Sequence, residues 1–492
     1  MKEKAVVVGG GVGGLAASAL LARDGFDVTL LEKNSRIGGR ARIWEADGFR
    51  FDMGPSWYLM PEVFDEFFRL FGREREDYYR LRRLDPAYRV FFSADEVVDV
   101  RADREQAMAV FDGFEPGGGQ RLARYLDLAA YKYDVAVGEF LYRNYESIFD
   151  FFNRRLLVEG LRLNVFSRLD RFVGRFFHDR RARQILEYAM VFLGTSPVKA
   201  PALYSIMSHV DLNLGVFYPH GGLAGVAQAF GRLAEEQGVR ILTDHPAERI
   251  ETDGGAVRAV SSRGETYPAD VAVVNADYAF AETHLLEENA RSFSPRYWEG
   301  RVWAPSMFLL YIGTDRRLES LEHHNLYFMP DWNEHFDTIF ERPGWPENPC
   351  FYLSCISKSD PDSAPQGGEN VFVLVPVAPG LDDTEERRES YAEHVLSHVE
   401  KITGEPIKSS AVVKRIFSHR DFAQDYNASQ GTALGLAHTL RQTAVFRPPL
   451  RSRKVNGLYY VGQYTHPGVG VPMVVIAARV AAGLVEKDRK AV

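Results

Sequence analysis

The residues best suited to chemistry near the N-terminus are three spaced glycines followed by one acid. Gly9, Gly11 and Gly14 form the pattern G-x-G-x-x-G, and Glu32 follows eighteen positions after Gly14. Glycine has no Cβ, so the backbone can approach a pyrophosphate closely, and the acid can accept hydrogen bonds from both ribose hydroxyls. The acid would also repel a 2′-phosphate. The pattern therefore predicts a site for the ADP half of a dinucleotide.

A strand, a helix and a second strand have to position these residues. The β-branched run at 6–8 predicts a buried strand that leads directly into the glycines. A helix is expected over 14–23, and a second strand over 28–31 ends just before Glu32. A helix that begins at the glycines would direct its free N–H groups and its dipole at the phosphates.

A second glycine pair with an arginine extends this site. Gly38, Gly39 and Arg40 precede the segment FDMGPS, which begins at Phe51 after a predicted hairpin. A nicotinamide enzyme has no evident use for this extension. The pair GGR and FDMGP resembles the flavoprotein superfamily of amine oxidases and carotenoid desaturases, in which the glycine pair and the arginine lie along the cofactor. The resemblance favours FAD over NAD.

The composition excludes several classes of function. The 59 Lys and Arg against 67 Asp and Glu give a net charge of −8, which argues against a general nucleic-acid-binding protein. His323, His324 and His335 do not have a zinc-ligand spacing, so we expect no metal. Residues 5–22 lack charge, but their glycines would destabilise a membrane-spanning helix, and we expect a cytoplasmic protein.

Two further segments, in the middle of the chain and at its end, complete the expected cofactor domain. GVFYPHGGLAGVAQAF from Gly215 predicts a glycine turn and a helix, and several short alternating strands follow. A strand at 457–462 ends in glycine, and the turn THPG from Thr465 leads to a final helix that opens near Met473. The free N–H groups of that helix could face a flavin pyrimidine oxygen or a phosphate.

These segments divide the chain into one discontinuous domain and two insertions. We expect 1–80, 219–290 and 450–492 to form the FAD-binding domain, 81–218 a helical insertion, and 291–449 a substrate-binding domain. Aromatic and basic residues are dense over 121–192. They predict docking on a membrane surface, where rings enter lipid and cations meet phosphates, or else an ordinary helical bundle with a basic face.

Over nearly all of its 492 residues the chain resembles the bacterial FAD-dependent phytoene desaturases. Beyond the glycine loop, the resemblance rests on FDMGPSWYLMPEVFDEFF, GVFYPHGGLAGVAQAF and GLYYVGQYTHPGVGVP. It implies an α/β fold: a Rossmann-like FAD-binding domain of the amine-oxidase type, a discontinuous mixed α+β substrate domain, and a helical, membrane-associating insertion. The residues that it implies as FAD contacts are Gly9, Gly11, Gly13, Gly14, Glu32, Lys33, Gly39, Arg40, Gly54, Pro55, Ser56, Ala247, Gly462, Gly470, Val471 and Met473. Among these, Ala247 is expected to meet the adenine through its backbone.

The resemblance also implies an activity. A linear C40 polyene would be dehydrogenated stepwise, phytoene towards neurosporene and lycopene, by hydride transfer to the flavin and loss of the vicinal proton. A membrane quinone or oxygen would then take up the electrons, and the protein would be peripheral on the cytoplasmic membrane. No spacing singles out a catalytic residue among the acids and histidines, which include Asp134, Glu139, His209 and Asp211.

Other activities fit the same motifs. A carotenoid 3,4-desaturase or isomerase of this family would carry them unchanged, and a flavin amine oxidase would share the nucleotide domain. A flavin-binding protein without catalytic activity is a further alternative. Gln463 and Tyr464 stand where small residues often precede the THPG turn, and they leave the substrate and the position of the new double bond open.

Overall fold

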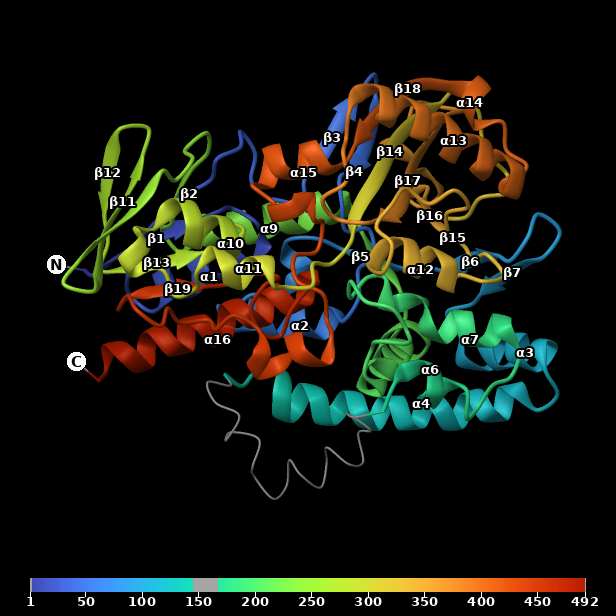
Figure 1. Ribbon diagram of the computed structural model, residues 1–492, viewed down its shortest axis with the longest axis horizontal. Coiled ribbons are helices and arrows are strands. Elements are labelled where there is room, and N and C mark those ends of the chain that lie inside the picture. The colour runs from blue at the N-terminus through green and yellow to red at the C-terminus, as the bar shows by residue number, and fades with distance from the viewer. Residues whose placement is uncertain (1, 145–166, 492) are drawn as a thin grey trace.

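A computed structural model describes residues 2–144 and 167–491 (Figure 1). The molecule is elongated, with a parallel sheet towards one end and a larger sheet towards the other. Helix α4 (Gly118–Val135) runs along one side, and both ends of the chain lie near the parallel sheet.

Five parallel strands from distant parts of the chain form the first sheet. Their order is β19-β13-β1-β2-β9, with bounds Leu458–Tyr460, Val271–Val274, Lys4–Val8, Asp27–Leu31 and Arg240–Leu242. In the central strand, Val7 pairs with Val273 on one side and with Leu30 on the other. The strands predicted at 6–8 and 28–31 are therefore neighbours, and the glycines follow the central one.

Alternating side chains of β1 are buried on both faces of this sheet. The covering elements are α1 (Val12–Arg23), α9 (Gly222–Glu236), α16 (Val471–Arg489), β10 (Arg249–Asp253), β11 (Ala256–Ser262) and β12 (Glu265–Pro268). Ala5 and Val7 pack with the three helices, whereas Val6 and Val8 pack with the antiparallel sheet β10-β11-β12. Both faces are covered, as parallel sheets require, so a ligand has access at the carboxyl ends of the strands.

The second sheet has seven strands and lies towards the end of the molecule away from the parallel sheet. Their order is β18-β14-β17-β16-β15-β6-β7, with bounds Ala411–Phe417, Ser306–Thr314, Glu369–Val377, Phe351–Ser354, His324–Tyr327, Tyr88–Phe91 and Val97–Val100. β6 and β7 come from 81–218, so that segment is not helical throughout. Tyr88 and Val90 of β6 are buried, while Arg89 between them donates to Asp99 of β7 at 2.7 Å. Buried and exposed side chains thus alternate at every second residue, as in a strand, within a segment that is otherwise largely helical.

The described helices of 81–218 include α3 (Arg104–Phe114), α4, α6 (Leu169–Val173), α7 (Arg180–Glu187) and α8 (Ile206–His209). Phe172 and Phe177 are buried there and contact Tyr125 of α4, so they contribute to the core. Leu128 and Tyr131 of α4, in contrast, are 45% and 40% exposed. The prediction of membrane docking also used aromatic and basic residues between 145 and 166, and these lie outside the described residues.

A short hairpin connects the two halves. Its strands are β3 (Ile43–Ala46) and β4 (Phe49–Asp52), as predicted before the FDMGPS segment. The Asp52 carboxylate accepts from the backbone N–H groups of Leu223 and Ala224, so it caps α9. Burial raises the pKa of Asp52 to about 6.

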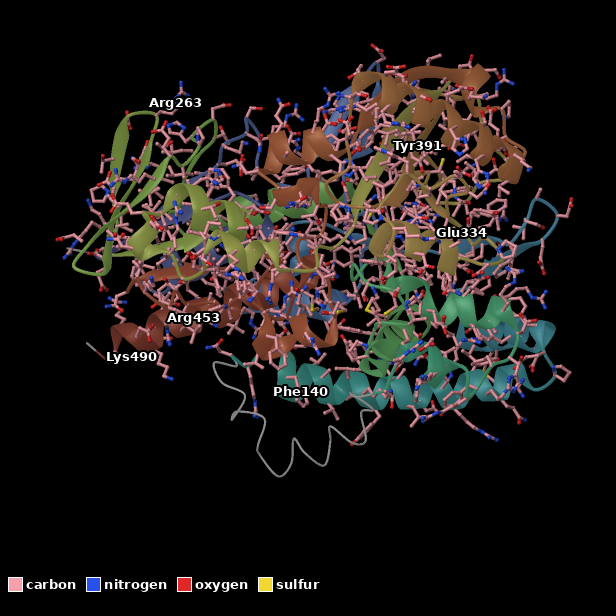
Figure 2. All side chains as sticks on the ribbon, in the orientation of Figure 1. Phe140, Arg263, Glu334, Tyr391, Arg453 and Lys490 are labelled. Atoms are coloured by element: carbon pink, nitrogen blue, oxygen red, sulfur yellow. The ribbon has the colours of Figure 1, made fainter. Side chains whose placement is uncertain are left out.

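The remaining elements are α2 (Pro61–Arg69), β5 (Leu81–Arg83), β8 (Phe217–Pro219), α10 (Tyr278–Phe280), α11 (Pro295–Glu299), α12 (Asn333–Phe340), α13 (Glu385–Thr403), α14 (Ile407–Ser410) and α15 (His419–Tyr426). A π-helical turn, Ala136–Leu141, continues α4. Figure 2 labels Phe140 at the end of α4, and its backbone carbonyl accepts from His466 Nε2 at 3.1 Å. Within residues 2–144 and 167–491, no helix is long and apolar enough to cross a membrane.

Candidate active site

One cavity of about 460 Å³ extends from the carboxyl ends of the parallel strands to the seven-stranded sheet. Val8 of β1, Leu31 of β2 and Asn275 after β13 line its first end. The cavity therefore lies where ligands bind in open parallel sheets. All the residues predicted to contact FAD line this cavity except Gly14.

Gly14 instead allows α1 to pack against the strand before it. A Cβ at Gly14 would lie 2.0 Å from the carbonyl oxygen of Gly9, which no side chain tolerates. This is the close helix–strand packing expected of the third glycine in the pattern. The first two glycines, Gly9 and Gly11, border the cavity itself.

Asn275 supports the glycine loop and was not predicted from the sequence. Its Nδ2 donates to the Gly9 carbonyl at 3.3 Å, and a Cβ at Gly13 would lie 2.7 Å from its Oδ1. Among the described residues, no side chain caps the N-terminus of α1. The N–H groups there remain available to an anion. The only sequence signal for Asn275 is a polar residue directly after a buried strand.

The acid and the lysine after β2 both have partners within the protein. The Glu32 carboxylate accepts from Gly10 N at 2.7 Å and from Asn34 N at 2.8 Å, and its side chain is buried beside the cavity. Lys33 Nζ donates to the Gln424 carbonyl at 2.6 Å and to Asn427 Oδ1 at 2.9 Å. Burial lowers the pKa of Lys33. Lys33 thus lines the cavity with its ammonium directed at the end of α15.

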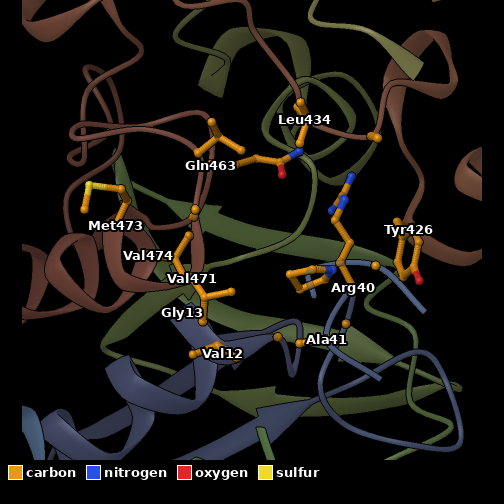
Figure 3. Close-up of a pocket in the computed structure, with 18 of the residues that line it drawn as sticks. Val12, Gly13, Arg40, Ala41, Tyr426, Leu434, Gln463, Val471, Met473 and Val474 are labelled. Atoms are coloured by element: carbon orange, nitrogen blue, oxygen red, sulfur yellow. The ribbon is translucent and has the colours of Figure 1, made fainter. Parts of the chain in front are cut away.

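Arg40 reaches into the middle of the cavity (Figure 3). Its guanidinium lies over the Tyr426 ring, 4.8 Å from the centroid, and its Nε is buried without a hydrogen-bond partner in the described chain. With the Gln463 amide turned so that its oxygen faces Arg40, that oxygen accepts from Arg40 Nη2 at 3.3 Å. A buried donor of this kind suits an anionic or polar ring system bound beside it.

The loop before α16 is held by a buried arginine. The Arg447 guanidinium donates to the backbone carbonyls of Gln442, Gln463, Tyr464 and Thr465 at 2.5 to 3.2 Å. Burial lowers the pKa of Arg447 to about 10, so it is still charged at neutral pH. The arginine therefore fixes the backbone that leads into the last cofactor segment.

A histidine holds the end of the same loop. His438 Nε2 accepts from Val469 N at 3.3 Å, and its Nδ1 lies 2.8 Å from Tyr204 Oη. Gly468, with a φ of +130°, passes so close that a Cβ there would lie 2.2 Å from His438 Cε1. Only glycine fits at this position. Neither Arg447 nor His438 belongs to a sequence motif, so sequence reasoning missed both.

The other end of the cavity is apolar. Met307, Leu309, Phe372 and Leu374 of β14 and β17 form one wall, and Phe192, Leu193 and Met207 of the helical region form another. The cavity also reaches Tyr133, Ala136 and Leu141 at the end of α4. A polar nucleotide end and a long apolar end are thus continuous.

Three of the residues considered as bases from the sequence lie away from this cavity as the described residues define it. Asp134, His209 and Asp211 do not line it. Among the described residues that do line it, the acids already have partners: Glu32 as above, Asp277 with Tyr464 and Ser429, and Asp425 with Arg42.

Comparison with known proteins agrees with this geometry. The family model described as flavin containing amine oxidoreductase matches residues 12–485. A carotenoid 3,4-desaturase of Haloarcula japonica is 46% identical over 487 residues, covering 99% of this chain and 98% of that protein. A zeta-carotene-forming phytoene desaturase of Myxococcus xanthus is 38% identical, covering 97% and 92%. Cyclohexylamine oxidase from Brevibacterium oxydans, at 15% identity, shares the fold with a TM-score of 0.60 over all of both chains.

The chain belongs to the flavin-containing amine oxidoreductases and, within them, to the carotenoid desaturase family. It is an FAD-dependent oxidoreductase. The site fits this cofactor. Among the described residues, no side chain caps the start of α1, which suits a pyrophosphate, and Arg40, which lines the cavity, has a buried Nε without a partner. The mixed α/β architecture of the amine oxidase flavoproteins, expected from the sequence, is confirmed.

Proposed function

We propose that this protein desaturates a linear C40 carotenoid, taking phytoene towards neurosporene and lycopene. The observation that carries the proposal is the continuous cavity, whose nucleotide end is lined by the glycine loops and whose other end is lined by apolar side chains. An apolar wall offers no partner for a charged substrate, but it suits a long hydrocarbon. The relatives named carotenoid 3,4-desaturase and phytoene desaturase support the same substrate class.

FAD, when bound, supplies an acceptor for two electrons and one hydrogen in the form of a hydride. We propose that Gly11, Gly13 and the start of α1 hold its pyrophosphate, and that Glu32 meets its ribose. Gly54, Pro55, Gly462 and the segment 470–473 would lie along the rest of the cofactor. The side chains of β14 and β17 would then hold the polyene against it and exclude water.

We propose the cofactor domain expected from the sequence, formed by 1–80, 219–290 and 450–492. Support comes from the five-stranded sheet, all of whose strands lie within these three stretches. Strands β6 and β7 extend the sheet of the substrate part, so 88–100 would be assigned with 291–449.

A second candidate is 3,4-desaturation of a later carotenoid. It is favoured by the 46% identity to the Haloarcula japonica protein of that name. Purified, FAD-loaded protein incubated with phytoene in liposomes, and separately with acyclic late carotenoids, distinguishes the two by product analysis. Formation of lycopene from phytoene supports the first candidate. A new double bond in a late carotenoid, with phytoene unchanged, supports the second.

An amine oxidase activity is disfavoured by the acids of the cavity. An ammonium substrate would need a carboxylate to pair with. Among described residues lining the cavity, Glu32, Asp277 and Asp425 are engaged by protein donors. Hydrogen peroxide released on addition of polyamines would contradict the desaturase proposal.

We also propose that the protein docks on the cytoplasmic membrane surface through α4. Leu128 and Tyr131 are exposed on this helix, and the cavity reaches its end at Ala136 and Leu141. A substrate dissolved in lipid could then enter without crossing water. Flotation with liposomes, with and without anionic lipid, tests the proposal, and protein that stays at the bottom of the gradient would contradict it.

A membrane quinone or oxygen is proposed as the electron acceptor. A quinone would share the lipid phase with the substrate, which supports the first choice if the protein docks on a membrane. Anaerobic turnover with a quinone, compared with aerobic turnover without one, decides between them. If neither the quinone nor oxygen supports turnover, both proposed acceptors are contradicted.

A further inference from the structure

A second pocket, separate from the active-site cavity, lies beside the start of α9. Its volume is about 640 Å³, which is typical of sites for small molecules. Residues of the hairpin β3–β4, of α9 and of the segment 78–80 line it. No described residue lines both this pocket and the cavity in which we place FAD. The pocket is therefore a distinct candidate site.

The charge of this pocket is opposite in sign to that of the whole chain, which has a net charge of −8. Its charged lining residues are four arginines and one acid, namely Arg36, Arg50, Arg80, Arg232 and Glu45. Positive charge gathered on a concave surface raises the local concentration of anions. We call this hollow the arginine pocket.

Two of these arginines are available to a ligand. The Arg80 side chain is exposed and has no partner within the described residues. Arg36 pairs with Glu45 at 3.2 Å, and both side chains are more than half exposed. Because an exposed ion pair contributes little to stability, Arg36 can turn towards a bound anion at small cost.

The other two arginines are held in place by the protein. Arg50 Nη2 donates to Asp360 at 2.8 Å, and Arg232 Nη2 donates to the Asp77 carbonyl at 2.8 Å. The Arg232 guanidinium also lies over the Tyr78 ring, 4.1 Å from its centroid. The arginine pocket thus combines two fixed positive groups with two adjustable ones.

Small residues of α9 keep the arginine pocket open. A Cβ at Gly221, the N-cap, would meet nothing within 4 Å, and Ala224 and Gly225 line the pocket one turn later. The N–H groups at the start of α9 are already engaged, because the Asp52 carboxylate accepts from Leu223 and Ala224. The arginines, and not the end of the helix, therefore define which ligand fits.

We propose that the arginine pocket binds a molecule that carries a phosphate or diphosphate group, with Arg36 and Arg80 as donors to its oxygens. The planar guanidinium matches two phosphate oxygens at once, and several guanidinium groups can surround one diphosphate. A soluble phosphate compound and a phospholipid headgroup share this chemistry. The site does not depend on which carotenoid the protein desaturates.

Isothermal titration calorimetry of the full-length, FAD-loaded protein with sodium pyrophosphate tests this site. Bound FAD keeps pyrophosphate away from the start of α1. Arg80→Gln should weaken pyrophosphate binding about tenfold, the value of a hydrogen bond to a charged group. Gln228→Glu should also weaken it, because it adds a carboxylate to the lining of the pocket. Both side chains are exposed, so neither variant should disturb the fold.

Arg296→Gln is the matched control. Arg296 is likewise exposed and has no partner in the part of the chain that the structure describes, but it lies on α11 and does not line the pocket. Its replacement changes the net charge by the same amount as Arg80→Gln and should leave the affinity for pyrophosphate unchanged. Flavin content and melting temperature are measured for each variant.

Flotation with vesicles that contain phosphatidic acid separates the two sources of the phosphate. Weaker flotation of Arg80→Gln than of wild type, together with release of the wild type by pyrophosphate, would assign the pocket to a lipid headgroup. Equal flotation of the two proteins, with weaker pyrophosphate binding by Arg80→Gln, would assign it to a soluble molecule.

Absence of pyrophosphate binding to the wild-type protein would overturn the proposed site. So would equal affinity in the wild type, Arg80→Gln and Gln228→Glu. An equal loss of affinity in Arg296→Gln would overturn it as well, because the net charge alone would then account for the binding.

Discussion

Asp211 is a buried carboxyl whose ionisation should make the protein less stable as the pH rises. It lies in the π-helical turn Val210–Leu214, where Oδ2 accepts from Tyr88 Oη at 2.8 Å and from Tyr188 Oη at 2.9 Å. Its Oδ1 has no partner among the described residues. Burial raises the pKa of Asp211 to about 7, against the opposing effect of the two tyrosine hydrogen bonds. The folded protein thus keeps a proton that the unfolded chain releases near pH 4.

The sign and the magnitude follow from this difference in pKa. The stabilisation is fully present below the unfolded pKa and is lost as the pH rises through the folded pKa. For pKa values of about 4 and about 7, the free energy of unfolding falls by about 3 kcal/mol between pH 5 and pH 8. Asp211→Asn removes this titration. The free energy of unfolding of the variant minus that of the wild type should therefore be about 3 kcal/mol larger at pH 8 than at pH 5.

Urea titrations of the FAD-loaded protein at the two pH values measure this double difference. Costs of the amide that do not depend on pH, and the titration of other buried acids, cancel between the two conditions. Asp27→Asn, at an exposed position of β2, is the matched control and should change stability equally at both pH values. A double difference below about 1 kcal/mol for Asp211→Asn would refute the reasoning.

Gly11→Val should abolish flavin retention, because its branched side chain would occupy space at the start of α1 where we place the pyrophosphate; yellow, folded variant protein would contradict this. Gly14→Ala should instead lower the yield of folded protein, because its Cβ would lie 2.0 Å from the Gly9 carbonyl; a native melting temperature would show that the packing is less strict. Leu128→Glu should reduce flotation with liposomes, whereas Val412→Glu, at another exposed apolar position but on β18, should not; equal flotation of both variants would count against docking through α4.

Much of the cofactor half could be predicted because its signals are local. The run at 6–8, the glycine spacing and Glu32 lie within one strand, helix and strand, and the structure places them together as expected. Glycine is required there by backbone geometry, which a short segment expresses through its own residue types. The helical prediction for 81–218 was less successful, because β6 and β7 are short and gain their stability from β15, more than 200 residues away.

The sequence by itself therefore determined the class of cofactor and the backbone cradle for it. Only the tertiary structure decided which side chains face the substrate and which hold the last cofactor loop. Arg447 donates to the backbone carbonyls of residue 442 and residues 463–465, and Tyr352 meets Ser56 from a strand that lies 296 positions later. Such contacts form when elements that are distant in the sequence pack together. Packing imposes no fixed spacing along the chain, so no pattern in the sequence predicts them.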